Sequence, residues 1–368
     1  MIRISKIFKR HDQAPEELPK GIKPDERSQE EKQAEEVAAQ RSAQGHHEPS
    51  IKISSALNKE LEKERFSAPN IAQLYDELLA KAKNVYSADP VTHHNLMAEI
   101  NPITERMIES MVSGNDELLL MVLRDYAKPK DMLYYHVVNI TIIALAMGHG
   151  LGYDRSRLLE LGLAAFVHDI GSKDLDILNK PDIISDVEFD KVKRHPDEGA
   201  LILSKIDVSL DKKILNAVSQ EHERADGSGY PKGLVSDEIN EYAQIIGLAD
   251  VYEALMHNRP YRAKYTSLDT IRIILKNKKV FPRKAIKALI EVFGIFPVET
   301  LVQLNTKEIG VVVKRNAELI SRPVIDIIID SYGKEMKEPK RINLADSPVI
   351  YIDNCVKQEE KGAETAPK

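Results

Sequence analysis

The spacing of hydrophobic residues predicts long amphipathic helices in the central part of the chain. From Ile71 onward, apolar residues recur every three or four positions, which is the period of a helix with one buried face. The pattern is clearest in the run HVVNITIIALAMGHGLG, where Ile140, Ile143 and Met147 share one helical face with His136. Because that face must point inward, His136 is expected in the core.

Further segments carry ligand-type residues on their own apolar faces. Ser185 and Glu188 form a capping box, which predicts a helix that carries both Val192 and His195, and Pro196 is expected to break this helix. Three more segments show the same arrangement, namely those of His168 and Asp169, of Glu221 and His222, and of Asp250. The sequence therefore predicts five helices that each aim one or two such residues inward.

These inward-facing residues favour a metal site. A single histidine on an apolar helix face is more often a hydrogen-bonded core residue than a ligand. Four histidines and three carboxylates on successive inner faces are hard to explain in that way. A buried charge without a partner destabilises the folded state by several kcal/mol, on the order of the total stability of a domain. Imidazole nitrogens and carboxylate oxygens are ligands of divalent metal ions, and an aspartate beside a histidine can bridge two of them.

Beyond Leu301 the hydrophobic period changes from 3.6 to 2, which predicts short strands in LVQLNTKEIGVVVKRN, PVIDIIID and SPVIYID. The first part of the chain is rich in charged residues and poor in large apolar ones, so it cannot offset its chain entropy by burial. The expected divisions are a disordered charged segment (1–66), a helical region (67–130), a helical metal-binding domain (131–298), a small β-rich subdomain (299–355) and a disordered tail (356–368).

Composition adds limits on location and partners. Of the 368 residues, 42% are apolar, which is ordinary for a globular protein with a substantial core. The single cysteine, Cys355, excludes a disulfide framework and favours a reducing compartment, so we expect the cytoplasm. A net charge of -6 gives no support to a surface for nucleic-acid polymers. The basic start of the chain has no apolar stretch, so no transmembrane segment is expected.

The order of these motifs resembles the HD-GYP family, a branch of the HD-domain metal-dependent phosphohydrolases. The resemblance rests on HDIG at His168, HPDEG at His195, HERADGSGYP at His222 and ADVYEALMHNRPYR at Ala249. The β-like segment that follows also resembles the one that commonly follows this domain. The resemblance implies a mainly α protein, with an HD-type helical bundle, an N-terminal helical region and a small C-terminal β appendage. It also implies hydrolysis of cyclic di-GMP at a centre that usually holds iron or manganese.

Carried over residue by residue, the resemblance implies a set of metal ligands in which Asp169 bridges the metals and forms the catalytic pair with His168. Glu221 stands where the family has a histidine, and we keep it as a ligand because carboxylates bind hard divalent cations. Family members with three metals have a glutamate where this chain has Met132, so two divalent ions are expected here. The complete set is His136, His168, Asp169, His195, Glu221, His222 and Asp250.

The resemblance also assigns residues to the substrate. Arg259 and Arg262 match positions that contact phosphate, a task that suits a planar guanidinium. The loop of Gly229, Tyr230 and Pro231 is associated with substrate access and with contacts to a signalling partner.

One departure bears on catalysis. The family's lysine, thought to hold the scissile phosphate, is Ser172 in this chain. The sequence therefore leaves two functions open. The first is a cyclic di-GMP phosphodiesterase that is slow because of Ser172 and Glu221. The second is a degenerate family member that binds the nucleotide and metal as a sensor or scaffold. A homodimer is a further expectation in either case.

Overall fold

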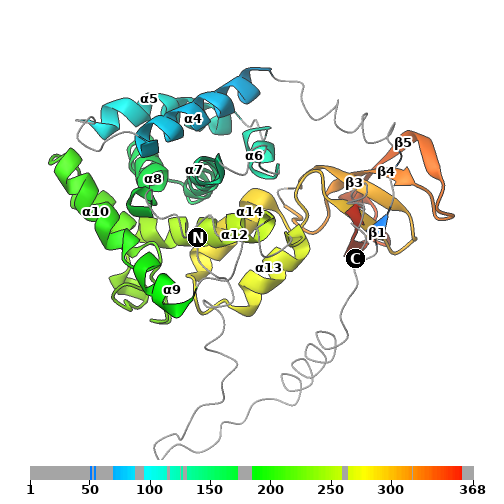
Figure 1. Cartoon of the computed structure of the whole chain (residues 1–368). Helices are drawn as coiled ribbons and strands as arrows, with labels where there is room; N and C mark the ends of the chain where they lie inside the picture. The colour runs from blue at the N-terminus through cyan, green and yellow to red at the C-terminus, as the bar shows by residue number, and fades with distance from the viewer. Residues whose placement is uncertain are drawn as a thin grey trace, which may run out of the picture.

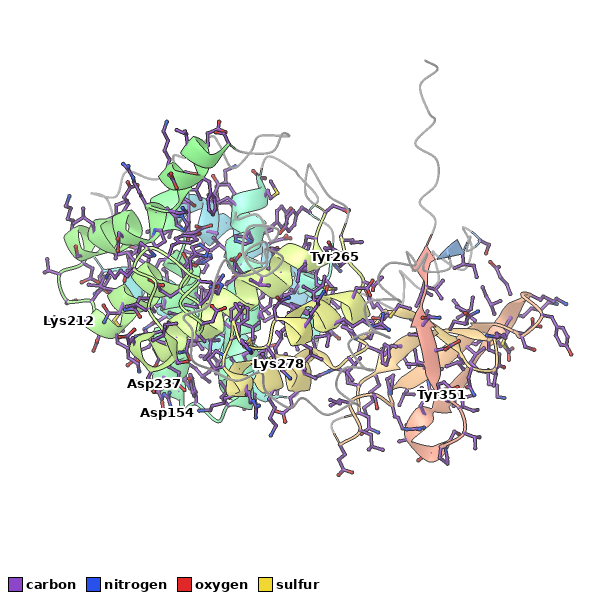
Figure 2. All side chains as sticks on the ribbon, turned by 90° about the horizontal axis from the view of Figure 1, so that it is seen from below. Asp154, Lys212, Asp237, Tyr265, Lys278 and Tyr351 are labelled. Carbon is purple, nitrogen blue, oxygen red and sulfur yellow. The ribbon has the colours of Figure 1, made fainter. Side chains whose placement is uncertain are left out.

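The structure, a computed structural model, describes residues 50–51, 54, 69–87, 95–113, 117–124, 126, 131–172, 185–258, 264–316 and 318–358. It contains a helical body and a smaller sheet (Figure 1). In Figure 2 the sheet, marked by Tyr351, lies at the opposite end of the molecule from Lys212 at the start of α11 (Lys212–Gln220). The predicted fold class, a helical bundle with an N-terminal helical region and a small C-terminal β appendage, is confirmed.

Helix α7 (Met132–Gly150) is the axis of the helical body (Figure 1). Its residues from His136 to Gly148 are all buried, because helices pack around it on every side. Among the described helices it alone is long and apolar enough to cross a membrane, a test that the core helix of a soluble protein also passes. Its neighbours are α4 (Pro69–Ser87), α5 (Leu96–Val112), α6 (Glu117–Val122), α8 (Arg155–Val167), α12 (Glu241–Met256) and α14 (Arg283–Phe293).

The remaining helical elements complete the body around α8 and α12. Helix α8 leads directly into the short 3-10 helix η4 (Ile170–Ser172), which contacts α10 (His195–Ile206). Helix α11 packs between α10, α8 and α12. The other elements are α9 (Asp186–Val192), η6 (Ser236–Glu238) and α13 (Ser267–Lys276).

One predicted helix is two helices in the structure. The capping box of Ser185 and Glu188 is present, but the helix it opens, α9, ends at Val192. His195 begins the next helix, α10, with Pro196 in its first turn. The prediction that Pro196 breaks a helix was wrong, because proline lacks only an N–H that has no partner in a first turn, and its fixed φ suits that position.

The predicted strands form one antiparallel sheet with the order β5-β4-β3-β2-β6. Alternation along the strands gives the sheet two buried faces. Val302, Val312 and Ile325 belong to the apolar cluster on one face, and Ile309 and Ile328 to that on the other. The strands are β2 (Leu301–Leu304), β3 (Ile309–Lys314), β4 (Val324–Ile329), β5 (Glu335–Asn343) and β6 (Ile352–Cys355), with η7 (Leu344–Asp346) after β5.

The two ends of the described chain meet at this sheet. Strand β1 (Ser50–Ile51) pairs in parallel with β7 (Lys357–Gln358), so these residues are not disordered as the segments 1–66 and 356–368 were predicted to be. The reason is burial, because Ile51 and Val356 pack on the cluster of Ile309 and Ile328. Most other residues of both segments lie outside the described part of the chain.

Gly171 permits the contact between η4 and α10. A Cβ atom at Gly171 would lie 2.1 Å from the carbonyl oxygen of His195 and 2.6 Å from the backbone nitrogen of Gly199. We expect Gly171→Ala to lower the free energy of unfolding by about 1–3 kcal/mol, because backbone atoms must move. Gly150→Ala is the control, since its Cβ would meet only Val292 at 3.8 Å. Urea denaturation measures both, and equal stabilities would contradict the expectation.

Candidate metal centre

All seven predicted ligands lie together in the interior. Each is buried, with at most 6% of its surface exposed. His136 comes from α7, His168 and Asp169 follow α8, His195 begins α10, Glu221 and His222 follow α11, and Asp250 lies in α12. Residues from five parts of the sequence therefore converge in one place.

Three of the histidine rings are held from behind. The Nδ1 of His168 donates to the carbonyl oxygen of Ala165 at 2.7 Å, and that of His195 donates to the carbonyl oxygen of Val192 at 2.6 Å. The Nδ1 of His136 donates to a carboxylate oxygen of Glu253 at 2.7 Å. Since Nδ1 carries the proton in each ring, the lone pair on Nε2 is left to face the centre, as metal binding requires.

Asp169 lies between two pairs of histidines. We call His136 and His168 the first pair, and His195 and His222 the second pair. Oδ2 of Asp169 is 3.8 Å from Nε2 of His136 and 3.9 Å from Nε2 of His168. Its other oxygen, Oδ1, is 3.3 Å from Nε2 of His195. One carboxylate therefore offers one oxygen to each pair, which is the arrangement of a bridging ligand.

Glu221 spans the two pairs in the same way. Its Oε2 is 3.7 Å from Nε2 of His168, in the first pair. Its Oε1 is 3.3 Å from Nε2 of His195 and 3.6 Å from Nε2 of His222, in the second pair. Glu221 is therefore placed as a second carboxylate that can bind on both sides, an arrangement that the sequence did not predict.

Asp250 closes the site from α12. Its Oδ1 is 3.4 Å from Nε2 of His136, and its Oδ2 is 3.9 Å from Nδ1 of His222. Three buried carboxylates thus each face both histidine pairs.

Burial and mutual repulsion set the protonation of these groups. Burial, together with the charges of Asp169 and Asp250, raises the pKa of Glu221 well above its usual range. Burial also opposes ionisation of Asp169, but the neighbouring His168 and His195 outweigh it and hold the pKa of Asp169 below its usual range. Burial lowers the pKa of His195 to about 4 and also lowers the pKa of His168. The imidazoles of His168 and His195 are therefore neutral near pH 7, the form that binds metal.

The donor set fits divalent cations. Oε2 of Glu221 and Nδ1 of His222 are buried without a hydrogen-bond partner among the described residues. A buried polar atom without a partner destabilises the fold by about 1–3 kcal/mol. Cations between the two histidine pairs would give Glu221 Oε2 a partner and offset the charge of three neighbouring carboxylates. The described clusters that could hold a metal ion are His136, His168 and Asp169, and His195, Glu221 and His222.

The loop of Gly229, Tyr230 and Pro231 lies directly against the centre. The backbone N–H of Tyr230 donates to the carbonyl oxygen of His222 at 3.1 Å, and the two rings stack with centroids 4.8 Å apart. A Cβ atom at Gly229 would lie 2.4 Å from the backbone nitrogen of Arg224, so only glycine allows this approach. The loop is thus placed to influence access to the metal site.

The carboxylate of Glu223 holds the far end of this loop. Its two oxygens accept hydrogen bonds from the backbone N–H groups of Lys232, at 2.7 Å, and Leu234, at 2.9 Å. Sequence reasoning missed Glu223, although its position beside His222 in an otherwise recognised motif was a signal.

Other predicted residues contribute differently or are not described. Arg259 and Arg262 lie outside the described residues, so their contact with phosphate stays a prediction. Ser172 is only 2% exposed, and its hydroxyl donates to the carbonyl oxygen of Asp169 at 2.8 Å. Met132 is buried at the start of α7.

Glu253 and Asn139 were also missed. Both are buried on the faces that approach the centre, and each lies one helical turn after a recognised ligand, Asp250 and His136 respectively. This spacing was the signal in the sequence, because residues three apart share one face of a helix.

The affinity of the centre for Mn²⁺ should fall as the pH is lowered through the raised pKa of Glu221, because the cation must then displace a proton. His195 adds little to this loss, since its pKa is about 4. Glu221→Gln should therefore bind Mn²⁺ more weakly at neutral pH but with a flatter pH dependence. Calorimetric titration at several pH values tests this, and equal slopes for both proteins would contradict it.

Comparisons with known proteins find matches to the part of the chain that carries these residues. The family model of the HD domain matches residues 107–282, and that of the KOW domain associated with HD domain matches residues 301–363. The chain is 31% identical over 204 residues to Cyclic di-GMP phosphodiesterase PA4108 of Pseudomonas aeruginosa, which covers 55% of this chain and 49% of that protein. It is 39% identical over 130 residues to 3'3'-cGAMP-specific phosphodiesterase 3 of Vibrio cholerae, which covers 35% of this chain and 28% of that protein.

A solved structure, that of Bd1817, a HDG"Y"P protein from Bdellovibrio bacteriovorus, aligns with a TM-score of 0.49 and 18% identity over 63% of this chain and 76% of that one. The chain spans about half the length of the Pseudomonas relative, and less of the Vibrio one. The matched family model and the ordered motifs lead to one conclusion: residues 107–282 form an HD domain, and their motifs resemble those of its HD-GYP branch.

Proposed function

We propose that this protein is a metal-dependent phosphodiesterase that hydrolyses cyclic di-GMP with two divalent ions, iron or manganese. The observation that carries the proposal is the set of three buried carboxylates, each of which faces both histidine pairs. The relative from Pseudomonas is named as a cyclic di-GMP phosphodiesterase, which supports the same substrate here. The residues that would hold the metals are His136, His168, Asp169, His195, Glu221, His222 and Asp250.

When bound, two divalent cations supply activation of the attacking water and neutralisation of phosphate charge. The side chains fix where this happens. Asp169 and Glu221 hold the two sides of the centre together, and His168 faces both of them through Nε2. Imidazole ligands leave the cations with positive charge to act on the phosphate, because an imidazole adds no negative charge of its own. Asp169 and His168 are therefore the proposed catalytic pair.

The substrate would enter beside the loop of Gly229, Tyr230 and Pro231. Tyr230 covers one face of His222, so this loop forms one wall next to the metal site. Arg259 and Arg262 complete the proposed contacts to phosphate, because a guanidinium can bind two oxygens at once. We propose that the same loop also contacts a signalling protein. We further propose that the protein is cytoplasmic and forms a homodimer.

Two residues make slow turnover part of the proposal. Ser172 turns its hydroxyl to the backbone of Asp169 and brings no positive charge to the phosphate. Glu221 adds a negative ligand where the family has a neutral histidine, which tightens a dication but makes it a weaker Lewis acid. The same observation on Ser172 favours the alternative function, a nucleotide- and metal-binding sensor or scaffold without turnover.

The full chain loaded with Mn²⁺ should hydrolyse cyclic di-GMP, as measured by chromatography of the products, and 3'3'-cGAMP serves as the competing substrate. Asp169→Asn should lower the rate by at least about 100-fold, because it removes a charge from both sides of the centre. Glu160→Gln is the control, since Glu160 pairs with Lys213 and Tyr242 away from the ligands. Binding of both metal and cyclic di-GMP without any turnover would establish the sensor instead.

Two variants of Ser172 separate the effect of a positive charge at this position from the effect of a longer side chain. Ser172→Lys should raise kcat by about tenfold if a missing cation limits the rate, a gain of roughly 1.4 kcal/mol in transition-state binding. Ser172→Met places a stem of similar length without charge at the same position and should give no gain. If both variants change kcat equally, the absence of a lysine is not what slows the enzyme.

A further inference from the structure

We propose that Glu253 is a positioning residue that orients and polarises His136 and thereby sets the affinity of the metal held by the first histidine pair. The inference rests on the proposed metal centre and deepens it. It concerns a side chain that binds no metal itself, because the contact of Glu253 is with Nδ1 of His136, on the side of the ring that faces away from Asp169 and Asp250.

Because Glu253 is fully buried, its carboxylate needs hydrogen-bond donors, and His136 is one of them. Glu253 lies in α12, one turn after Asp250, and none of its surface is exposed. Its Oε2 accepts the Nδ1 proton of His136 at 2.7 Å. A hydrogen bond to a charged acceptor is about twice as strong as one between neutral groups. The carboxylate therefore fixes the ring and increases the electron density on Nε2, the atom that faces the centre.

This contact makes the two histidine pairs different. His168 and His195 donate their Nδ1 protons to backbone carbonyl oxygens, those of Ala165 and Val192. His136 is backed by a carboxylate instead. Because a carboxylate raises the basicity of its imidazole more than a neutral carbonyl does, the first pair contains a stronger ligand than His195 in the second. Loss of the charge at Glu253 should therefore weaken one metal and spare the other.

The second oxygen of Glu253 is also held in place. The hydroxyl of Tyr126 donates to Oε1, and Nδ2 of Asn139 lies 3.5 Å from the same atom. The hydroxyl of Tyr75 donates to Oδ1 of Asn139 at 2.7 Å, which turns the amide nitrogen toward Glu253. Nδ1 of His257 lies 3.2 Å from Oε1 of Glu253, and the ring of His257 stacks on that of Tyr126 with centroids 4.6 Å apart. These contacts hold the side chain of Glu253 in one orientation. Helix α4 takes part through Tyr75, which orients Asn139.

Titration of the full chain with Mn²⁺ tests the inference without using activity. The wild-type protein should bind two ions, and Glu253→Gln should bind one with unchanged affinity and the other about 10- to 100-fold more weakly. Glutamine keeps the shape and an acceptor oxygen, so the loss isolates the charge. Glu160→Gln, which removes a carboxylate elsewhere in the helical body, should bind both ions as the wild type does.

A spectroscopic measurement separates positioning from a general structural effect. With ¹⁵N-labelled histidine and Zn²⁺ as a diamagnetic stand-in, the Nδ1 proton resonance of His136 should move upfield in Glu253→Gln, because its hydrogen bond weakens. The resonances of His168 and His195 serve as internal references and should stay in place, since their acceptors are backbone carbonyls. A shift of all three, or of none, would overturn the inference.

The outcomes distinguish this inference from the proposed function. Unchanged binding of two Mn²⁺ ions by Glu253→Gln, or equal loss in Glu160→Gln, overturns the role of Glu253 and leaves the phosphodiesterase intact. If Glu253→Gln loses one ion selectively and the wild-type protein hydrolyses neither cyclic dinucleotide, the role of Glu253 is supported and the proposed enzyme is overturned. A wild-type protein that binds no Mn²⁺ overturns both.

Discussion

Three carboxylates buried among four imidazoles are the constraint on which the structure depends. Burial alone would make each charge costly, and the carboxylates also repel one another. The surrounding backbone approaches closely enough to hold them only where side chains are absent. Gly171, Gly229 and Gly247 each lie where a Cβ atom would collide with the backbone that carries a ligand or its neighbour. Helix α7 supplies the rigid axis against which these elements pack.

Glu221 offers the centre two donor atoms where a histidine would offer one. A histidine ring there could present one lone pair to the centre, whereas the carboxylate has one oxygen near each histidine pair. The replacement therefore adds a possible bridge beside that of Asp169. We propose that the site therefore holds its cations firmly and hydrolyses slowly, so that the departure from the family pattern retunes the centre and does not dismantle it.

Much of this centre could be predicted from the sequence, because helical periodicity shows which way a side chain faces. It placed His136, His168 and Asp250 in the interior, and the alternating pattern after Leu301 gave the strands of the sheet. Periodicity does not show which oxygen of a carboxylate faces which ring, so the two-sided position of Glu221 needed coordinates. It also could not give the pairing of β1 with β7, because their registers depend on contacts between opposite ends of the chain.

The support around the ligands was missed for a related reason. The spacing of Glu253 and Asn139 after recognised ligands shows only which helical face they share. The fold alone shows that Glu253 meets His136, and that Tyr75 and Tyr126 reach in from the preceding helical region. These side chains make the site continuous with the helices that come before the recognised motifs.

Anomalous diffraction from crystals of the Mn²⁺-loaded protein tests the central claim most directly. The expected result is two metal peaks about 3.5–4 Å apart, one at each histidine pair, with oxygens of both Asp169 and Glu221 bound to each. A single peak, or two peaks with Glu221 bound to neither, would contradict the account.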